Sequence, residues 1–129
     1  MKIVKIAALG LAAALCASGA QAAAGDYEFQ AVSPDVKAGS NVELAVRLVY
    51  KPTQKPVSGA VLFRTRLDMS PENMASMIAA ITPESSSEAG VYRFKADLSM
   101  AGRWALKLMA KAPGESETVT GSVIVKAKD

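Results

Sequence analysis

Three methionines within nine residues, Met69, Met74 and Met77, are the side chains whose type and spacing suggest metal chemistry. Thioethers are soft, neutral ligands that select Cu(I) or Ag(I) over Zn²⁺ and Mg²⁺. On a helical turn, Met74 and Met77 would share one face, and Met69 would close the strand before that turn. The sequence therefore predicts a site at which three thioethers hold one soft metal ion.

The same methionines also have a structural interpretation. Methionine fills irregular gaps in protein cores. Met74 and Met77 recur in phase with Ile78 and Ile81, which is typical of a helix packed on a sheet. Met69 lies on the same face of its predicted strand as other apolar residues. Two hypotheses therefore stand side by side, a Cu(I) site and a packed cluster without a metal.

The residue types of most enzymes are missing. The chain contains no His and a single Cys, which excludes a Ser-His-Asp triad, a Cys-His pair and His-bound zinc. No glycine-rich phosphate loop or calcium-loop spacing is present. The pairs Glu84 with Glu88 and Glu115 with Glu117 lack surroundings that would tune a carboxyl pKa. We expect a non-enzymatic protein, with Cu(I) or Ag(I) as the one cofactor that the residues could hold.

The first 22 residues have the three parts of a secretory signal peptide. Two lysines are followed by an uncharged stretch of 12 residues, 6–17, and then by the small residues of Ala20-Gln21-Ala22. The stretch is shorter than the roughly 20 apolar residues of a membrane span, and an uncleaved anchor is the alternative. We expect cleavage after Ala22, a periplasmic location and one mature domain, residues 23–129, without a membrane span.

The mature chain is nearly neutral. Its 107 residues include 13 basic and 12 acidic side chains, a net charge of +1, and no cysteine. This charge argues against nucleic-acid binding, which needs a basic footprint, and no disulfide can stabilise the domain. Leu15 precedes Cys16 where a lipoprotein signal has a small residue, so we expect Cys16 to leave with the signal peptide. A hydrophobic core must hold the domain together.

Alternation of apolar and polar residues predicts a mostly β structure. Six strands are expected, separated by the Pro, Gly and Asn residues of turns. They cover residues 27–32, 42–50, 60–69, 91–98, 104–111 and 119–125. Their parity predicts that Phe63, Phe94, Trp104 and Leu106 are buried between two sheets, and Pro113-Gly114 predicts a hairpin. Short strands at this spacing indicate an antiparallel sandwich.

One segment departs from this pattern. Ser70-Pro71 has the residue types of a helix start. Apolar residues then recur every three or four positions as far as Ile81. The segment 70–81 is therefore predicted to be a short helical crossover between the sheets, and the polar segment 82–88 a mobile loop.

Outward-facing basic residues offer a possible contact surface. Arg64 and Arg66 lie on one predicted strand, and Arg93 and Lys95 on another. If the two strands were neighbours, these side chains would form a basic stripe for an acidic partner. Interleaved aspartates favour an ordinary solvated face instead.

Two aromatic residues have both a functional and a structural interpretation. Trp104 could cover a Cu(I) ion with its ring, although its parity with Leu106 and Leu108 favours a place in the core. Tyr92 follows Gly90 and is expected to bind the backbone through its hydroxyl, as a corner tyrosine does.

Three pieces of the chain together resemble the YtkA-like and FixH families of bacterial periplasmic or membrane-tethered domains. The pieces are Asn41-Val42 through Lys55-Pro56-Val57-Ser58-Gly59-Ala60-Val61, Asp68-Met69 through Met74 and Met77, and Gly90-Val91-Tyr92 through Met100-Ala101-Gly102-Arg103-Trp104-Ala105-Leu106. The resemblance implies an immunoglobulin-like or cupredoxin-like β-sandwich outside the cytoplasm, with a non-enzymatic role. Members of this kind are associated with the handling of heavy metals, especially copper, or with cytochrome oxidase assembly.

Two functions follow as hypotheses. The first is a periplasmic accessory protein that binds or passes Cu(I) or Ag(I) through its methionines, in metal export or oxidase assembly. The alternative is an interaction module that binds a membrane transporter or another periplasmic protein by an edge strand or a loop. In that case Met69, Met74 and Met77 belong to the core.

Overall fold

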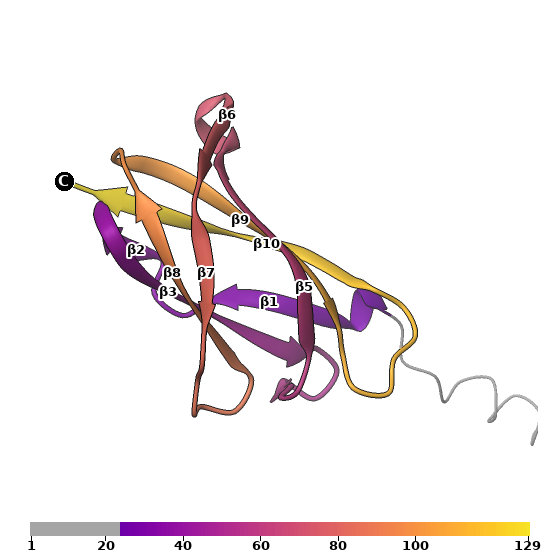
Figure 1. Ribbon diagram of the computed structural model, residues 1–129. Coiled ribbons are helices and arrows are strands. Elements are labelled where there is room, and N and C mark those ends of the chain that lie inside the picture. Colours follow the sequence, from indigo (N-terminus) through magenta and orange to yellow (C-terminus); the bar gives the residue numbers. More distant parts are fainter. Residues whose placement is uncertain (1–23) are drawn as a thin grey trace, which may run out of the picture.

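The computed structural model describes residues 24–129, which form two packed β-sheets (Figure 1). The predicted signal peptide, with its cleavage after Ala22, lies outside these residues. In chain order the strands are β1 (Tyr27–Ala31), β2 (Asp35–Lys37), β3 (Gly39–Tyr50), β4 (Lys55–Pro56), β5 (Val61–Met69), β6 (Met74–Ala79), β7 (Ile81–Glu84), β8 (Val91–Leu98), β9 (Gly102–Lys111) and β10 (Val119–Lys128). Two 3₁₀ turns are present, η1 (Ala24–Asp26) and η2 (Ser70–Glu72).

The strands are divided between two five-stranded sheets. Sheet A has the order β1-β3-β8-β7, with β4 paired to β3, and sheet B has the order β2-β10-β9-β5-β6. Neighbouring strands are antiparallel, except that β2 runs parallel to β10. The predicted all-β sandwich and its six strands are confirmed. Within residues 24–129, no helix has the length and apolar character needed to cross a bilayer.

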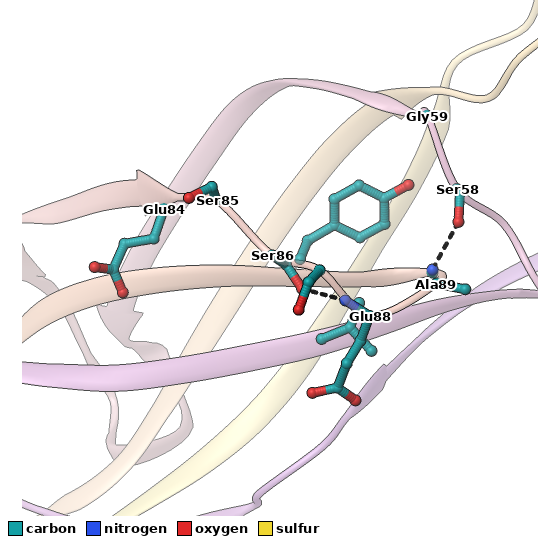
Figure 2. Close-up of a pocket in the computed structure, with 11 residues that line it drawn as sticks. Ser58, Gly59, Glu84, Ser85, Ser86, Glu88 and Ala89 are labelled. Carbon is teal, nitrogen blue, oxygen red and sulfur yellow. Dashed lines mark hydrogen bonds between the residues drawn. The ribbon is translucent and has the colours of Figure 1, made fainter.

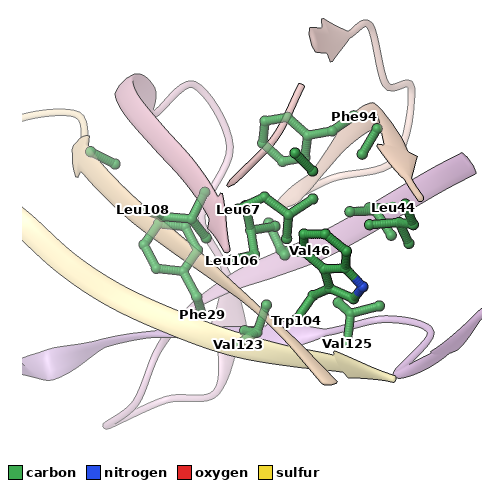
Figure 3. Packing of buried hydrophobic residues seen from close by; sticks show 14 of the residues in the cluster. Phe29, Leu44, Val46, Leu67, Phe94, Trp104, Leu106, Leu108, Val123 and Val125 are labelled. Carbon is green, nitrogen blue, oxygen red and sulfur yellow. The ribbon is translucent and has the colours of Figure 1, made fainter. Parts of the chain in front are cut away.

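The core lies between the sheets and is built from alternate residues of the long strands (Figure 3). Phe94 on sheet A and Leu106 and Trp104 on sheet B are buried, as predicted. The Trp104 ring is 1% exposed, and its Nε1 donates a hydrogen bond to the Met100 carbonyl oxygen at 3.1 Å. Trp104 is therefore a core residue with a satisfied polar atom, and its ring does not cover a surface metal site.

The burial predicted for Phe63 is wrong, because this side chain is 50% exposed. The ladder between β5 and β9 shifts register between Leu62 and Arg64. A bulge of this kind adds one residue to a strand and inverts the side-chain parity on one side of it. Leu62 consequently packs against the core in place of Phe63.

The helical crossover predicted over 70–81 is wrong beyond its first turn. The helical part ends after Glu72, where Asn73 has a left-handed backbone with φ 59°. The chain then forms β6 in sheet B and, past Ala80, β7 in sheet A, so the segment 82–88 also begins as a strand. Figure 1 shows how this segment joins the two sheets.

The apolar spacing that suggested a helix has a different cause. Asp68 pairs with Ile78, whereas the next residue of β5, Met69, pairs with Met74. Residues 75–77 therefore have no counterpart on β5 and form a wide bulge. Such an insertion lengthens the distance between successive core-facing residues from two to three or four positions, which imitates a helical period.

Candidate functional site

The residues that carry the family resemblance contact one another at two places. At the first, Tyr92 bridges two backbone groups of the segment 57–60. Its hydroxyl donates to the Val57 carbonyl oxygen at 2.7 Å and accepts from the Ala60 N–H at 3.0 Å. Burial raises the pKa of Tyr92 above its ordinary value. The structural role predicted for Tyr92 is confirmed.

Gly90 completes this first contact. Its N–H donates to the Ser58 hydroxyl at 2.9 Å, and its backbone has a left-handed φ of 72°. A Cβ atom at Gly90 would lie 2.5 Å from the Cβ of Pro56. Both the conformation and the close approach require glycine, so this contact serves the fold rather than a ligand.

The second contact joins η2 to the start of β9. The Arg103 backbone N–H and its side-chain Nε both donate to Glu72 Oε2, at 3.0 and 3.2 Å, and its terminal nitrogen donates to the Pro71 carbonyl oxygen. These hydrogen bonds hold the pKa of Glu72 below its ordinary value. A Cβ atom at Gly102 would lie 2.7 Å from Met69 Cε, so the start of β9 lies directly against the end of β5.

The three methionines predicted as metal ligands all pack against the core. Met69 is 1% exposed, and Met74 and Met77 are partly buried against the same cluster. The β5–β6 register places Met69 opposite Met74, while Met77 lies in the bulge of β6. Two of the three soft donors are thus brought together at one position of the ladder. Their burial favours the packed-cluster interpretation.

The carboxylates Glu84 and Glu88, singled out in the sequence as a pair, each contact a basic side chain. Within residues 24–129, no three His, Cys, Asp or Glu side chains gather where they could hold a metal ion. A pocket of about 550 Å³ at the β7–β8 loop contains Glu84 and Glu88 (Figure 2), whose carboxylates do not point toward one another. Glu84 pairs with Lys95 at 3.6 Å and Glu88 with Arg93 at 2.6 Å. Each of these two carboxylates therefore forms an ion pair with a basic side chain of β8.

The basic stripe predicted from Arg64, Arg66, Arg93 and Lys95 is not formed. Strand β5 belongs to sheet B and lies between β9 and β6, whereas β8 belongs to sheet A. The alternation of the residues was read correctly, but sequence alone does not give the neighbours of a strand. The two arginines of β5 have other basic neighbours.

The outer face of sheet B is strongly basic, and we call it the basic face. Eight of the 13 Lys and Arg side chains in residues 24–129 lie on it, against three of the 12 acidic ones. The basic residues are Lys37, Arg64, Arg66, Arg103, Lys107, Lys111, Lys126 and Lys128, and the acidic ones are Asp35, Asp68 and Glu72. The net charge of this face is +5, although residues 24–129 together carry +1.

Asp68 lies at the centre of the basic face and is 0% exposed. One of its oxygens, Oδ2, accepts from Arg66 Nε at 2.7 Å and from Lys107 Nζ at 3.0 Å, and Oδ1 accepts from the Ser70 N–H at 3.0 Å. Burial opposes the charged carboxylate, but the hydrogen bonds from Ser70, Arg66 and Lys107 outweigh it. They hold the pKa of Asp68 well below its ordinary value.

A pocket of about 460 Å³ adjoins this carboxylate on the same face. Arg64, Arg66 and Lys107 line one part of it, and Thr120, Gly121 and Ser122 line the part on β10. The sequence predicts that the two arginines and Lys107 face outward, but it does not group Lys107 or the β10 residues with the arginines. The alternation of the sequence predicts that these side chains face outward. It does not predict that β9 lies between β5 and β10, which is what brings them together.

The outer strands of both sheets are poorly suited to pairing with another chain. In sheet A, β7 contains Pro83, which lacks an N–H, and β1 lies against β10 of the other sheet. In sheet B, β2 is three residues long and carries Asp35 and Lys37, and β6 is interrupted by its bulge. Proline, charge, short length and bulges all protect sheet edges.

Comparison with known proteins identifies relatives of this chain. The profile of the family described as YtkA-like matches residues 21–109. Among solved structures, FdeC, an adhesin of Escherichia coli, is similar over 81% of this chain and 31% of its own, with a TM-score of 0.42 and 18% identity. A conjugative transposon lipoprotein from Bacteroides eggerthii is similar over 81% of this chain and 98% of its own, with a TM-score of 0.34 and 12% identity. The chain thus spans less than a third of the adhesin structure, and no curated protein matches it.

Proposed function

Since the chain belongs to the YtkA-like family, we propose that it is a periplasmic, non-enzymatic interaction module that binds an acidic surface of another protein through the basic face. The observation that carries this proposal is the segregation of charge. One face holds eight basic and three acidic side chains, whereas the remaining five basic and nine acidic side chains give the rest of residues 24–129 a net charge of −4. Complementary charge of this kind steers encounter and fixes orientation.

The sheet edges are poorly suited to strand pairing, which supports binding of the partner through the outer face of a sheet. Edge pairing would require an extended run of free backbone groups, and the outer strands β2, β6 and β7 are short, bulged or contain proline. The basic face, in contrast, exposes apolar side chains among its charges, including Ile78 and Ile124. A mixed basic and aliphatic face fits a partner that is itself folded, such as the periplasmic part of a membrane transporter or another periplasmic protein.

Photo-cross-linking in the cells that produce the protein tests the proposal. A photoreactive residue is placed at Ile124 on the basic face or at Thr82 on sheet A, both of which are exposed. We expect a specific protein adduct from Ile124 that disappears in an Arg64→Glu, Lys126→Glu variant. The matched control, Lys51→Glu with Lys55→Glu, makes the same change in charge away from this face and should keep the adduct.

Two results would contradict the proposal. One is an adduct formed from Thr82 but not from Ile124. The other is an adduct at Ile124 that survives charge reversal at Arg64 and Lys126, because binding would then not depend on the charge of the face.

Cu(I) or Ag(I) binding through Met69, Met74 and Met77, in metal export or oxidase assembly, is a second candidate function. One observation favours it: the register places Met69 opposite Met74. Soft, neutral thioethers at this place would suit a soft monovalent ion. Their burial against the core is the observation on the other side.

Anaerobic titration against a Cu(I) competitor separates the two roles of the methionines. A thioether site would take about one equivalent and lose it when the three are changed to Leu, which conserves volume and should cost less than about 1.5 kcal/mol per site in stability. Equal, weak binding by the wild-type protein and the Leu variant would assign Met69, Met74 and Met77 to packing alone.

A further inference from the structure

The pocket on the basic face combines three cationic side chains with a largely apolar lining that includes Met109, so it suits a group with an anionic tip on an aliphatic stem. Two rows of outward side chains run across strands β5, β9 and β10. In the first row Met109 lies between Arg64 and Thr120. In the second row Lys107 lies between Arg66 and Ser122. Cations therefore stand at the β5 and β9 side, and hydroxyl groups at the β10 side. The recess that they line measures about 460 Å³.

Two of the three cations of this pocket, Arg66 and Lys107, are held in place before any ligand arrives. Arg66 donates through Nε to Asp68 and through a terminal nitrogen to the Ala75 carbonyl oxygen at 3.0 Å. Lys107 is held by the same Asp68 oxygen. Side chains that are already ordered lose less conformational entropy when they bind a ligand. Asp68 thus acts as an internal support for two of the three cations.

The charge of the pocket is not neutralised from within. Asp68 offsets one of the three positive charges, which leaves a net charge of +2. Within residues 24–129, Arg64 has neither an ion-pair nor a hydrogen-bond partner. Its guanidinium, which can bind a carboxylate with two parallel hydrogen bonds, is free to meet a ligand.

We propose that this pocket is a subsite for a Glu or Asp side chain of an extended acidic segment of the partner protein. Arg64 and Lys107 would bind the carboxylate, and Thr120 and Ser122 would donate to it or to the neighbouring peptide groups. The proposal rests on the proposed function and deepens it. A recess in the middle of a sheet face suits a protruding side chain, whereas a lipid bilayer presents a flat surface that meets protruding loops first.

Binding of hexaglutamate to the purified protein, followed by backbone NMR shifts and calorimetry at low salt, tests the subsite. We expect the largest shifts at Arg64, Lys107, Thr120 and Ser122, and no binding of hexaglutamine. Arg64→Gln should weaken binding at least fivefold, and Ser122→Trp, which fills the recess without changing charge, should abolish it. Lys55→Gln removes one positive charge on the other sheet and should leave the affinity within twofold.

Several outcomes would overturn the subsite. Equal weakening by Arg64→Gln and Lys55→Gln would mean that hexaglutamate responds to overall charge alone. Binding to phosphatidylglycerol vesicles that depends on Arg64, without binding of hexaglutamate, would assign the pocket to a membrane surface. If hexaglutamate does not bind while the charge-dependent adduct at Ile124 still forms, the subsite fails and the interaction module stands.

Discussion

The hydroxyl of Tyr92 donates a hydrogen bond to the carbonyl oxygen of Val57, 35 residues earlier in the chain, at a distance of 2.7 Å. The same oxygen atom of Tyr92 accepts from the Ala60 N–H. One side chain thereby satisfies two backbone groups of the irregular segment between β4 and β5. Backbone groups in such a segment cost free energy when they are buried without partners, so the residue acts on stability.

Changing Tyr92 to Phe should destabilise the domain by about 1–3 kcal/mol, since it removes the donor to Val57 and leaves the Ala60 N–H without its acceptor. Urea unfolding measured by Trp104 fluorescence gives the free energy. Tyr50→Phe is the matched control, because among residues 24–129 the Tyr50 hydroxyl does not bridge two backbone groups as the Tyr92 hydroxyl does. Equal effects of the two changes would argue against the bridging role of Tyr92.

Gly90→Ala should be strongly destabilising, by more than about 2 kcal/mol, because the new Cβ would meet the backbone and ring of Pro56 and also occupy a left-handed conformation. Gly114→Ala provides the comparison. Gly114 has a similar φ of 80° but no atom within 4 Å of its Cβ position. Gly114→Ala should therefore lose only the free energy needed to place an alanine in a left-handed conformation. A loss at Gly90 no larger than that at Gly114 would contradict the close contact with Pro56.

Asp68 should make the stability of the domain depend on acid pH. Its pKa is lower in the folded than in the unfolded chain, so between these two values the unfolded chain binds more protons. The contribution of Asp68 is therefore present at neutral pH and is lost as the pH falls below the ordinary Asp value of 3.8. Asp68→Asn should lose about 2 kcal/mol at pH 7.

Urea unfolding at pH 7 and at pH 3 checks this prediction. The difference between the wild-type protein and Asp68→Asn should shrink at the lower pH. Asp35→Asn is the control, since Asp35 makes one exposed pair with Lys128 at 3.8 Å and such pairs contribute little. A constant difference at both pH values would mean that the charge of Asp68 is not the stabilising feature.

Phe63→Ala should cost less than about 1 kcal/mol, whereas Phe94→Ala should cost about 3–5 kcal/mol. The reason is burial: Phe63 is half exposed at the bulge of β5, and Phe94 is 2% exposed in the core. Thermal unfolding of the two variants decides the matter. A large loss for Phe63 would place its ring between the sheets and would contradict the bulge.

Sequence patterns predicted the long strands well because each of these strands has one buried and one solvated face. Phe94, Trp104 and Leu106 follow this alternation and were placed correctly. The patterns failed where a bulge interrupts a strand. At Leu62–Arg64 a bulge reversed the parity, and between Met74 and Ile78 a larger one imitated a helix. A bulge is a property of the pairing between two strands and leaves little trace in either sequence.

The candidate site was predictable only in part for a related reason. That Arg64 and Arg66 face outward follows from the sequence of β5 alone. Their association with Lys107 and Ser122 depends on which strand lies beside which, and that order is set by long-range packing of the whole sandwich. Arg93 and Lys95, the predicted neighbours of these arginines, lie at outward positions of β8, which belongs to sheet A.

The contacts that hold this domain together leave the β10 part of the basic face unused. The core takes the inward side chains, and the two contacts made by Tyr92 and Arg103 lie elsewhere. Thr120, Ser122 and Ile124 point away from all of these. Residues at such positions can be exchanged during evolution at little cost to folding. Homologous domains can therefore diverge in the protein that they recognise while they keep the same sandwich.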